Sequence, residues 1–377
     1  MSGAALLAGV SLRQLNLRNR IVISPMCQYA AADGVPGDWH LVHLGRFAIG
    51  GAGLVFTEAT AVEPRGRISH GCTGLWNDLQ TEAWARVTTF VKSQGAAIGV
   101  QLAQAGRKAS LHRTWEGGGP LTEADRIGGE PPWQTIGPSP LPYGDWPAPH
   151  AMTDREIDEQ LELWRSAALR AVDAGFDVIE IHGGHGYLLH SFLSPLSNHR
   201  LDAYGGDANR RMQFPLEVVG VVRAAWPADR PLFYRVSAVD HAAGGLTIED
   251  TVAFAKALKL QGVDVVDCSS GSIVPGPPPI SLGYQAPYAE TVRRDAGVLS
   301  MAVGLIIDPL QAEQIIQSGQ ADLVAIGRAA LADPNWPVRA KHELDSQGSW
   351  DGFSTRPRFW LKARAETLRR IGVTADR

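Results

Sequence analysis

Short apolar runs alternate with longer amphipathic segments along most of the chain. Apolar runs that are bounded by turn residues are typical of strands in a buried parallel sheet. This pattern predicts eight strands, which in chain order are Ile21–Ser24, Leu54–Thr57, Ile98–Leu102, Asp177–His182, Leu232–Ser237, Val263–Cys268, Leu299–Val303 and Leu323–Ile326.

Helical periodicity fills the intervals between most of these strands. One of the helices begins with a capping box in which Thr153 is followed by Glu156. The predicted helices are Thr81–Gln94, Thr153–Ala174, Arg210–Ala225, Thr247–Leu260, Pro309–Ser318 and Arg328–Glu343. Strands that alternate with helices in this way predict an α/β fold, a closed (β/α)8 TIM barrel. An open doubly wound sheet is the alternative, but no G-x-G-x-x-G opens a helix after the first strand.

Three segments depart from the strand–helix repeat. Residues 115–150 are rich in Gly, Pro and Trp, residues 271–283 are rich in Pro, and residues 345–377 form a polar, basic tail. The first two follow strands three and six, and loops after strands form the functional face of such a barrel. We therefore expect a single barrel over residues 1–344, with these two loops as lids, followed by the tail.

Composition and charge restrict the class of protein. The chain has 377 residues, of which 45% are hydrophobic and 20% charged, and its net charge is −4. No block of like charges suggests a nucleic-acid or membrane partner. The first residues lack the basic and apolar regions of a signal peptide, and no apolar stretch is long enough to span a bilayer. Three scattered cysteines fit a reducing cytoplasm, where we expect the protein to reside.

Reactive side chains collect where the predicted strands end, and that end of a barrel carries the active site. The sharpest group is His182-x-x-His185-x-Tyr187, after strand four. Two imidazoles and a phenol can hold a carbonyl oxygen and supply a proton. They can also be hydrogen-bonded structural side chains. Zinc needs a third ligand and the H-E-x-x-H spacing is absent, so we expect no metal site.

Other strand ends carry residues with more than one possible role. Cys27 can be a nucleophile, a thiol facing a flavin or a small buried residue, and Tyr29 faces the same side in an extended segment. Gln101 and Arg235 are polar residues in apolar strands. A buried Arg needs a partner, which an electron-rich cofactor ring and a structural carboxylate supply equally well. Gly304, Gly327 and Arg328 fit either a phosphate site after strands seven and eight or tight turns.

These motifs resemble the Old Yellow Enzyme family, and specifically its YqjM-like (thermophilic-like) class, which includes xenobiotic reductase A. The resemblance covers nearly the whole chain, from Leu17-Arg18-Asn19-Arg20-Ile21 to Ala325-Ile326-Gly327-Arg328. Its specific motifs are Ser24-Pro25-Met26-Cys27, Gln101-Leu102-Ala103, Gly106-Arg107-Lys108-Ala109, and the stretch from His185-Gly186-Tyr187-Leu188 through Leu193-Ser194-Pro195, Asn198-His199-Arg200 and Asp202 to Tyr204-Gly205-Gly206.

The resemblance implies a non-covalently bound FMN at the mouth of the barrel. The residues that it places around the isoalloxazine are Ser24, Pro25, Met26, Cys27, Ala59, Gln101 and Arg235. Gly304, Gly327 and Arg328 would help hold the phosphate. Cys27 would tune the flavin potential rather than form a covalent intermediate.

The resemblance also implies a reaction, that of an NADPH-oxidising ene-reductase with ping-pong kinetics. NADPH reduces the flavin, which then passes hydride to the β-carbon of an α,β-unsaturated carbonyl compound or a similarly activated alkene. His182 and His185 bind the activating oxygen, Tyr29 assists there, and Tyr187 donates the proton. Arg235 stabilises the anionic reduced flavin. Quinones and nitro compounds are further possible substrates.

The Gly183-Gly184 pair and the C-terminal segment bear on how this chain differs from, or assembles like, its relatives. Gly183-Gly184 stands where relatives commonly carry Ala or a bulkier residue, and we expect the extra backbone freedom to loosen the His pair. In this class the C-terminal segment of a neighbouring subunit reaches the active site, for which Arg358 and Trp360 are the candidates. The resemblance therefore implies a homodimer or a tetramer of dimers.

Three other classes of protein fit parts of the pattern. One is another FMN barrel oxidoreductase, such as a dihydroorotate or dihydrouridine enzyme, but these lack the paired His before Tyr. A second is a metal-dependent lyase or hydrolase that uses His182 and His185. A third is a non-catalytic flavin-binding redox sensor that uses Cys27.

Overall fold

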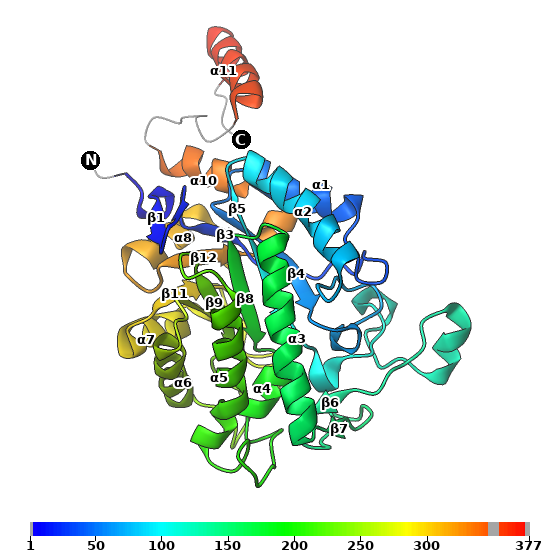
Figure 1. Ribbon diagram of the computed structural model, residues 1–377. Helices are drawn as coiled ribbons and strands as arrows, with labels where there is room; N and C mark the ends of the chain where they lie inside the picture. Colours follow the sequence, from blue (N-terminus) through cyan, green and yellow to red (C-terminus); the bar gives the residue numbers. More distant parts are fainter. Residues whose placement is uncertain (1–2, 346–353, 374–377) are drawn as a thin grey trace.

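A closed parallel barrel forms the body of the molecule (Figure 1). The computed structural model describes residues 3–345 and 354–373. Strand neighbours around the barrel run in the order β10-β11-β12-β3-β4-β5-β8-β9, which confirms the predicted (β/α)8 fold. The barrel strands are β3 (Ile21–Ile23), β4 (Leu54–Ala61), β5 (Ala97–Ala103), β8 (Val178–Gly183), β9 (Leu232–Ser237), β10 (Val265–Ser269), β11 (Leu299–Ala302) and β12 (Leu323–Ile326).

Alternation along the strands sorts the barrel interior into layers. A small apolar cluster that includes Val178, Phe233 and Val265 fills the lower interior, and the β1–β2 hairpin (Val10–Leu12 and Leu15–Leu17) packs against it. Side chains two residues further along a strand point to the same side. The next interior layer therefore holds Glu180, Arg235 and Asp267, and His182 follows at the mouth.

Helices surround the barrel, and several differ from expectation (Figure 1). Helices α1, α4 and α7 are not predicted. Exposed Trp39 and Val42 blur the pattern of α1, α4 has only six residues, and α7 is rich in charge. The predicted helix Arg328–Glu343 is two helices, since Asp333 precedes a proline and leaves helical geometry. The helices are α1 (Asp38–Ile49), α2 (Asp78–Ser93), α3 (Asp154–Asp173), α4 (Leu188–Leu193), α5 (Ala208–Ala225), α6 (Ile248–Leu260), α7 (Ala286–Ala296), α8 (Pro309–Gln317), α9 (Arg328–Ala332), α10 (Trp336–Leu344) and α11 (Thr355–Arg370).

The two long loops meet at one end of the barrel. Within residues 115–150, β6 (Ile136–Gly137) pairs with β7 (His150–Ala151). Arg107 joins this loop to the 271–283 loop, since its guanidinium donates to the carbonyl of Leu141 at 3.2 Å and to that of Ile273 at 2.6 Å. Both loops thus pack beside the strand ends that carry the candidate site.

The C-terminal tail contains a helix that the polar sequence does not predict. Helix α11 has no buried residue, and in Figure 1 it stands apart from the barrel, beyond α10. Among the described helices, none has both the length and the apolar character that crossing a membrane requires.

Candidate functional site

The end of β8 brings His182, His185 and Tyr187 together. The Nε2 atom of His182 lies 3.3 Å from Nδ1 of His185, and the rings of His182 and Tyr187 meet edge to face with centroids 5.0 Å apart. The His182 Nδ1 atom accepts from the Gly184 amide at 3.3 Å, so the ring proton is on Nε2. His182 then donates to His185, which in turn donates from Nε2 to Ser269 Oγ at 2.7 Å.

The backbone of this loop is tightly held. His185 has a φ of 57° and Gly186 a φ of 75°, which places two successive residues in the left-handed region. The His185 amide donates to Ser237 Oγ at 2.9 Å, and the Nζ of Lys108 donates to the His185 carbonyl at 2.9 Å. The strained turn fixes the direction in which the His185 and Tyr187 side chains point.

Burial keeps all three side chains neutral. Desolvation, followed by the charge of Arg235, lowers the pKa of His182 and of His185 well below its ordinary value. Desolvation, reinforced by the neighbouring Cys27, raises the pKa of Tyr187 well above its ordinary value. The site therefore presents two uncharged imidazoles and a phenol that retains its proton.

Cys27 and Tyr29 lie across from the histidines on the segment after β3. Both side chains, and that of Tyr187, pack against a small cluster that contains Ala59 and Cys72. Burial raises the pKa of the Cys27 thiol well above its ordinary value, so the sulfur remains protonated. Tyr29 has a φ of 51°, and its ring meets Trp115 of the long loop edge to face at 5.6 Å.

A buried charged cluster forms the floor of the site. Arg235 lies 3.2 Å from Asp267 Oδ2 and donates to Ser24 Oγ at 3.2 Å. Gln101 donates to Glu180 Oε1 at 2.8 Å. Of the two partners that the sequence left open for Arg235, the structural carboxylate is thus present, while the Nε of Arg235 has no hydrogen-bond partner among the described residues.

The floor holds two carboxylates but one guanidinium. Glu180 Oε2 and both oxygens of Asp267 lack hydrogen bonds within the described chain. Burial, followed by the negative charge of Asp267, raises the pKa of Glu180 to about 8. Burial also raises the pKa of Asp267, although Arg235 opposes this. The cluster therefore retains a proton at neutral pH.

The candidate phosphate residues come together at neighbouring strand ends. Gly304 follows β11 with a φ of 113°, and Gly327 lies between β12 and α9. A Cβ at Gly327 would lie 3.7 Å from Met26 Sδ and 3.9 Å from Ser24 Cβ. Arg328 is exposed beside them. Pro25 lies between Ser24 and Met26, so the β3 residues assigned to the ring adjoin those assigned to the phosphate.

Lys108 is a site residue to which the sequence analysis gave no role. Its Nζ donates to the carbonyls of His185 and Ser272, and it lies 4.4 Å from the centroid of the Tyr143 ring and 5.6 Å from that of Tyr187. Burial, aided by the nearby Arg107, lowers the pKa of Lys108 to about 8. The Gly106-Arg107-Lys108 run after strand three was the available signal.

Two predicted residues are not at the site of this chain. Arg358 and Trp360 lie on α11, and Trp360 is 71% exposed. Within the described residues, no group of three or more His, Cys, Asp or Glu is placed to hold a metal ion.

Gly183 does not provide the freedom expected of the Gly183-Gly184 pair. It ends β8, and a Cβ at this position would overlap the ring and hydroxyl of Tyr234 on β9. A Cβ on Gly184 would lie 3.0 Å from the Ser237 amide. The glycines thus allow close packing between neighbouring strands, and the His pair stands on a tightly packed turn.

Changes at this packing contact should alter stability in opposite directions. Gly183→Ala should lower the free energy of unfolding by about 1–3 kcal/mol, because the methyl group overpacks the core. Tyr234→Phe should raise it by about 1 kcal/mol, because the buried Tyr234 hydroxyl has no partner in the described chain. Urea unfolding of both variants measures the two effects, and a loss of stability in Tyr234→Phe would show that its hydroxyl is paired.

The chain is similar to known proteins of one enzyme family. The model of the NADH:flavin oxidoreductase / NADH oxidase family matches residues 5–347. The NADPH dehydrogenase of Geobacillus sp. (strain WCH70) is 44% identical over 337 residues, which cover 89% of this chain and 93% of that protein. The NADPH dehydrogenase of Bacillus subtilis (strain 168) is 43% identical over 341 residues, which cover 90% of this chain and 94% of that protein.

Solved structures agree in fold. Morphinone reductase superposes with a TM-score of 0.76 at 26% identity, over 94% of each chain. A 2-naphthoyl-CoA reductase in complex with 2-naphthoyl-CoA gives a TM-score of 0.81 at 22% identity, over 90% of this chain and 52% of that one, which concerns the fold alone. The family match and the curated relatives confirm the resemblance found in the sequence: the chain is an oxidoreductase of the NADH:flavin oxidoreductase / NADH oxidase family, that is, of the Old Yellow Enzyme family.

Proposed function

We propose that the protein is an FMN-dependent ene-reductase that oxidises NADPH and reduces α,β-unsaturated carbonyl compounds or similarly activated alkenes, with quinones and nitro compounds as further substrates. The observation that carries this proposal is the contact of His182, His185 and Tyr187, which are all neutral, at the mouth of the barrel. Neutral donors around one point suit an oxygen on which negative charge develops.

The residues present fit an FMN. Arg235 keeps one buried N–H without a partner in the described chain, at the point where the edge of a flavin ring would lie. Gly304 and Gly327 carry no side chain at two adjacent strand ends, which leaves backbone open to a phosphate. We assign the ring to Ser24, Pro25, Met26, Cys27, Ala59, Gln101 and Arg235, and the phosphate to Gly304, Gly327 and Arg328.

Each polar residue at the mouth has a role in this proposal. Bound FMN supplies hydride transfer, from NADPH and then to the β-carbon of the alkene. A substrate oxygen placed at the contact of the two imidazoles would accept the Nε2 proton of His182. His185 would donate from Nδ1 to the same oxygen once Ser269 Oγ donates to its Nε2, and Tyr29 would complete the surroundings. Tyr187 donates the proton to the α-carbon, and the ammonium of Lys108 beside its ring stabilises the phenolate that results.

Exposed apolar side chains on two helices support a homo-oligomer. On α11, Phe359 is 63% and Trp360 is 71% exposed, and on α1, Trp39 is 57% and Val42 is 67% exposed. Surface of this kind suits contact between protein copies. We propose a homodimer, or a tetramer of dimers, in which α11 brings Arg358 and Trp360 to the active site of the neighbouring subunit.

The absorption spectrum of the purified protein tests this function. We expect a yellow protein with bound FMN, whose flavin absorbance is bleached by NADPH without oxygen and restored by cyclohexenone or a maleimide. Cyclohexanone is the matched control, because it offers the same carbonyl oxygen but has no activated double bond to accept hydride. A colourless protein that takes up no FMN, or a reduced flavin that no activated alkene reoxidises, would refute the proposal.

A further inference from the structure

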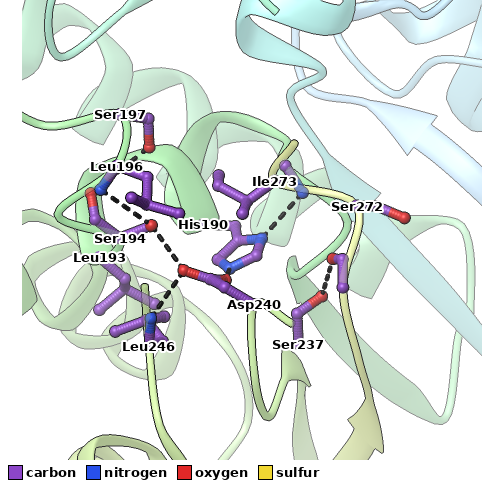
Figure 2. Close-up of polar contacts among 12 residues, drawn as sticks. His190, Leu193, Ser194, Leu196, Ser197, Ser237, Asp240, Leu246, Ser272 and Ile273 are labelled. Carbon is purple, nitrogen blue, oxygen red and sulfur yellow. Dashed lines mark hydrogen bonds and ion pairs between the residues drawn. The ribbon is translucent and has the colours of Figure 1, made fainter. Parts of the chain in front are cut away.

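His190 and Asp240 form a buried histidine–carboxylate pair (Figure 2). His190 belongs to α4, and Asp240 lies in the loop after β9. The Nε2 atom of His190 is 2.9 Å from Oδ1 of Asp240, and both side chains are fully buried. Neither residue was singled out by the sequence pattern, and the proposed reaction gives neither of them a role.

Hydrogen bonds determine where the proton of His190 lies. The Gly186 amide donates to His190 Nδ1 at 2.8 Å, so Nδ1 is an acceptor and the proton is on Nε2. His190 then donates that proton to Asp240 Oδ1. The other oxygen of Asp240 accepts from Ser194 Oγ and from the Leu246 amide, both at 2.7 Å (Figure 2). Each polar atom of the pair thus has a partner, and the orientation of the imidazole is unique.

This pair holds the Gly186 peptide, between residues that other contacts hold. The His185 amide is bound by Ser237, and the His185 side chain contacts Ser269. The Gly186 amide is bound by His190, in a left-handed turn that is costly without fixed partners. Gly186 directly precedes Tyr187, whose own amide donates to the Gly184 carbonyl at 3.2 Å. The direction of the Tyr187 side chain therefore depends on that contact together with the hydrogen bond from Gly186 to His190.

We propose that the His190–Asp240 pair is a positioning device for Tyr187, in which Asp240 orients His190 and His190 fixes the Gly186 peptide so that the phenol points at the substrate. This inference rests on the proposed function, in which Tyr187 is the proton donor. The pair acts through the backbone, since the contacts of His190 are with Gly186 and Asp240 on the side away from the site.

Two substitutions of His190 separate its two hydrogen bonds. In His190→Asn, the amide oxygen takes the place of Nδ1 and accepts from Gly186, but the contact with Asp240 is lost. In His190→Gln, the amide nitrogen takes the place of Nε2 and donates to Asp240, but Gly186 loses its acceptor. Each variant leaves one buried group unpaired, a carboxylate oxygen of Asp240 in His190→Asn and the Gly186 amide in His190→Gln, so both should lose stability. Thermal unfolding and FMN content establish that both variants are folded.

Stopped-flow measurement of the two half-reactions tests the proposal. We expect His190→Gln to slow reoxidation by cyclohexenone by about 10²-fold, the effect of a misplacement of about 1 Å, and to slow flavin reduction by NADPH far less. We expect His190→Asn, which keeps the bond to Gly186 but loses its orientation by Asp240, to slow reoxidation much less than His190→Gln does. In the Tyr187→Phe background, His190→Gln should cause no further slowing, because the group that it misplaces is already absent. Equal slowing by Asn and Gln, or full slowing in the Tyr187→Phe background, would overturn the proposal.

Hydrogen exchange gives a readout that does not depend on the reaction. The Gly186 amide should exchange faster in His190→Gln than in His190→Asn, while the His185 amide, bound by Ser237, should be unchanged in both. If Tyr187→Phe alone leaves reoxidation unchanged, the proton-donor role fails. Faster exchange of the Gly186 amide in His190→Gln than in His190→Asn would still support the role of the pair in fixing the loop. Equal exchange in the two variants would overturn that role.

Discussion

Replacing Tyr187 with Phe is expected to slow reoxidation of the reduced flavoprotein by an activated alkene by about 10²- to 10⁴-fold, the contribution of a positioned general acid. The phenol lies beside the two imidazoles, and burial raises its pKa well above the ordinary value, so it holds a proton throughout the neutral range. Phe retains the ring that packs against His182 but has no proton to give. Anaerobic stopped-flow mixing with cyclohexenone measures this step directly.

The same variant contains its own control. Flavin reduction by NADPH needs no proton from Tyr187 and should keep nearly its full rate. Tyr29→Phe removes a phenol on the other side of the site and should slow reoxidation far less. Equal slowing of both half-reactions by Tyr187→Phe would instead indicate a general disturbance of the site and would remove Tyr187 as the acid.

The barrel could be predicted from sequence because its signals are local. Strands covered on both faces must be apolar runs, and each of the eight runs is a strand of the barrel. The missed elements lack that signal. Helix α1 buries Leu44 and Phe47 but also exposes Trp39 and Val42, and α11 buries no residue, so neither shows a clear division between an apolar and a polar face.

Only the site residues that follow predicted strands could be found from the sequence. His182, His185 and Tyr187 stand close together after the fourth strand, and the C-terminal ends of barrel strands lie at the mouth. The partners of buried polar groups are far apart in sequence, as with His190 and Asp240, separated by 50 positions. Nothing in a local pattern pairs such residues. The packing of Gly183 against Tyr234 is equally non-local, since it depends on the alignment of β8 with β9.

A neutral mouth above a charged floor is the electrostatic plan of the site. Burial keeps His182 and His185 uncharged, and below them Arg235 faces two carboxylates. A shared proton on Glu180 and Asp267 leaves the floor with no net charge, which avoids an uncompensated ion in the barrel. Loss of that proton would give the floor a net negative charge and oppose any negative charge that develops above Arg235.

Glu180→Gln is expected to remove a pH dependence of stability. Burial, reinforced by Asp267, raises the pKa of Glu180 from 4.5 to about 8, so the folded protein holds a proton that the unfolded chain has released. Because the folded state binds more protons in this window, the free energy of unfolding falls as pH rises from about 4.5 to about 8, by at most about 1.4 kcal/mol per pH unit. Gln imitates the protonated carboxyl and still accepts from Gln101, so this decline should disappear.

The measurement is the difference between two stability profiles. Urea unfolding of the holoprotein and of Glu180→Gln at a series of pH values cancels the contributions that they share. Among these are His182 and His185, whose lowered pKa values make stability rise with pH up to about 6.5. The variant should gain stability relative to the unaltered protein as pH increases, and the gain should level off above pH 8. Parallel profiles would mean that Glu180 is ionised in the folded state and does not hold the proton of the floor.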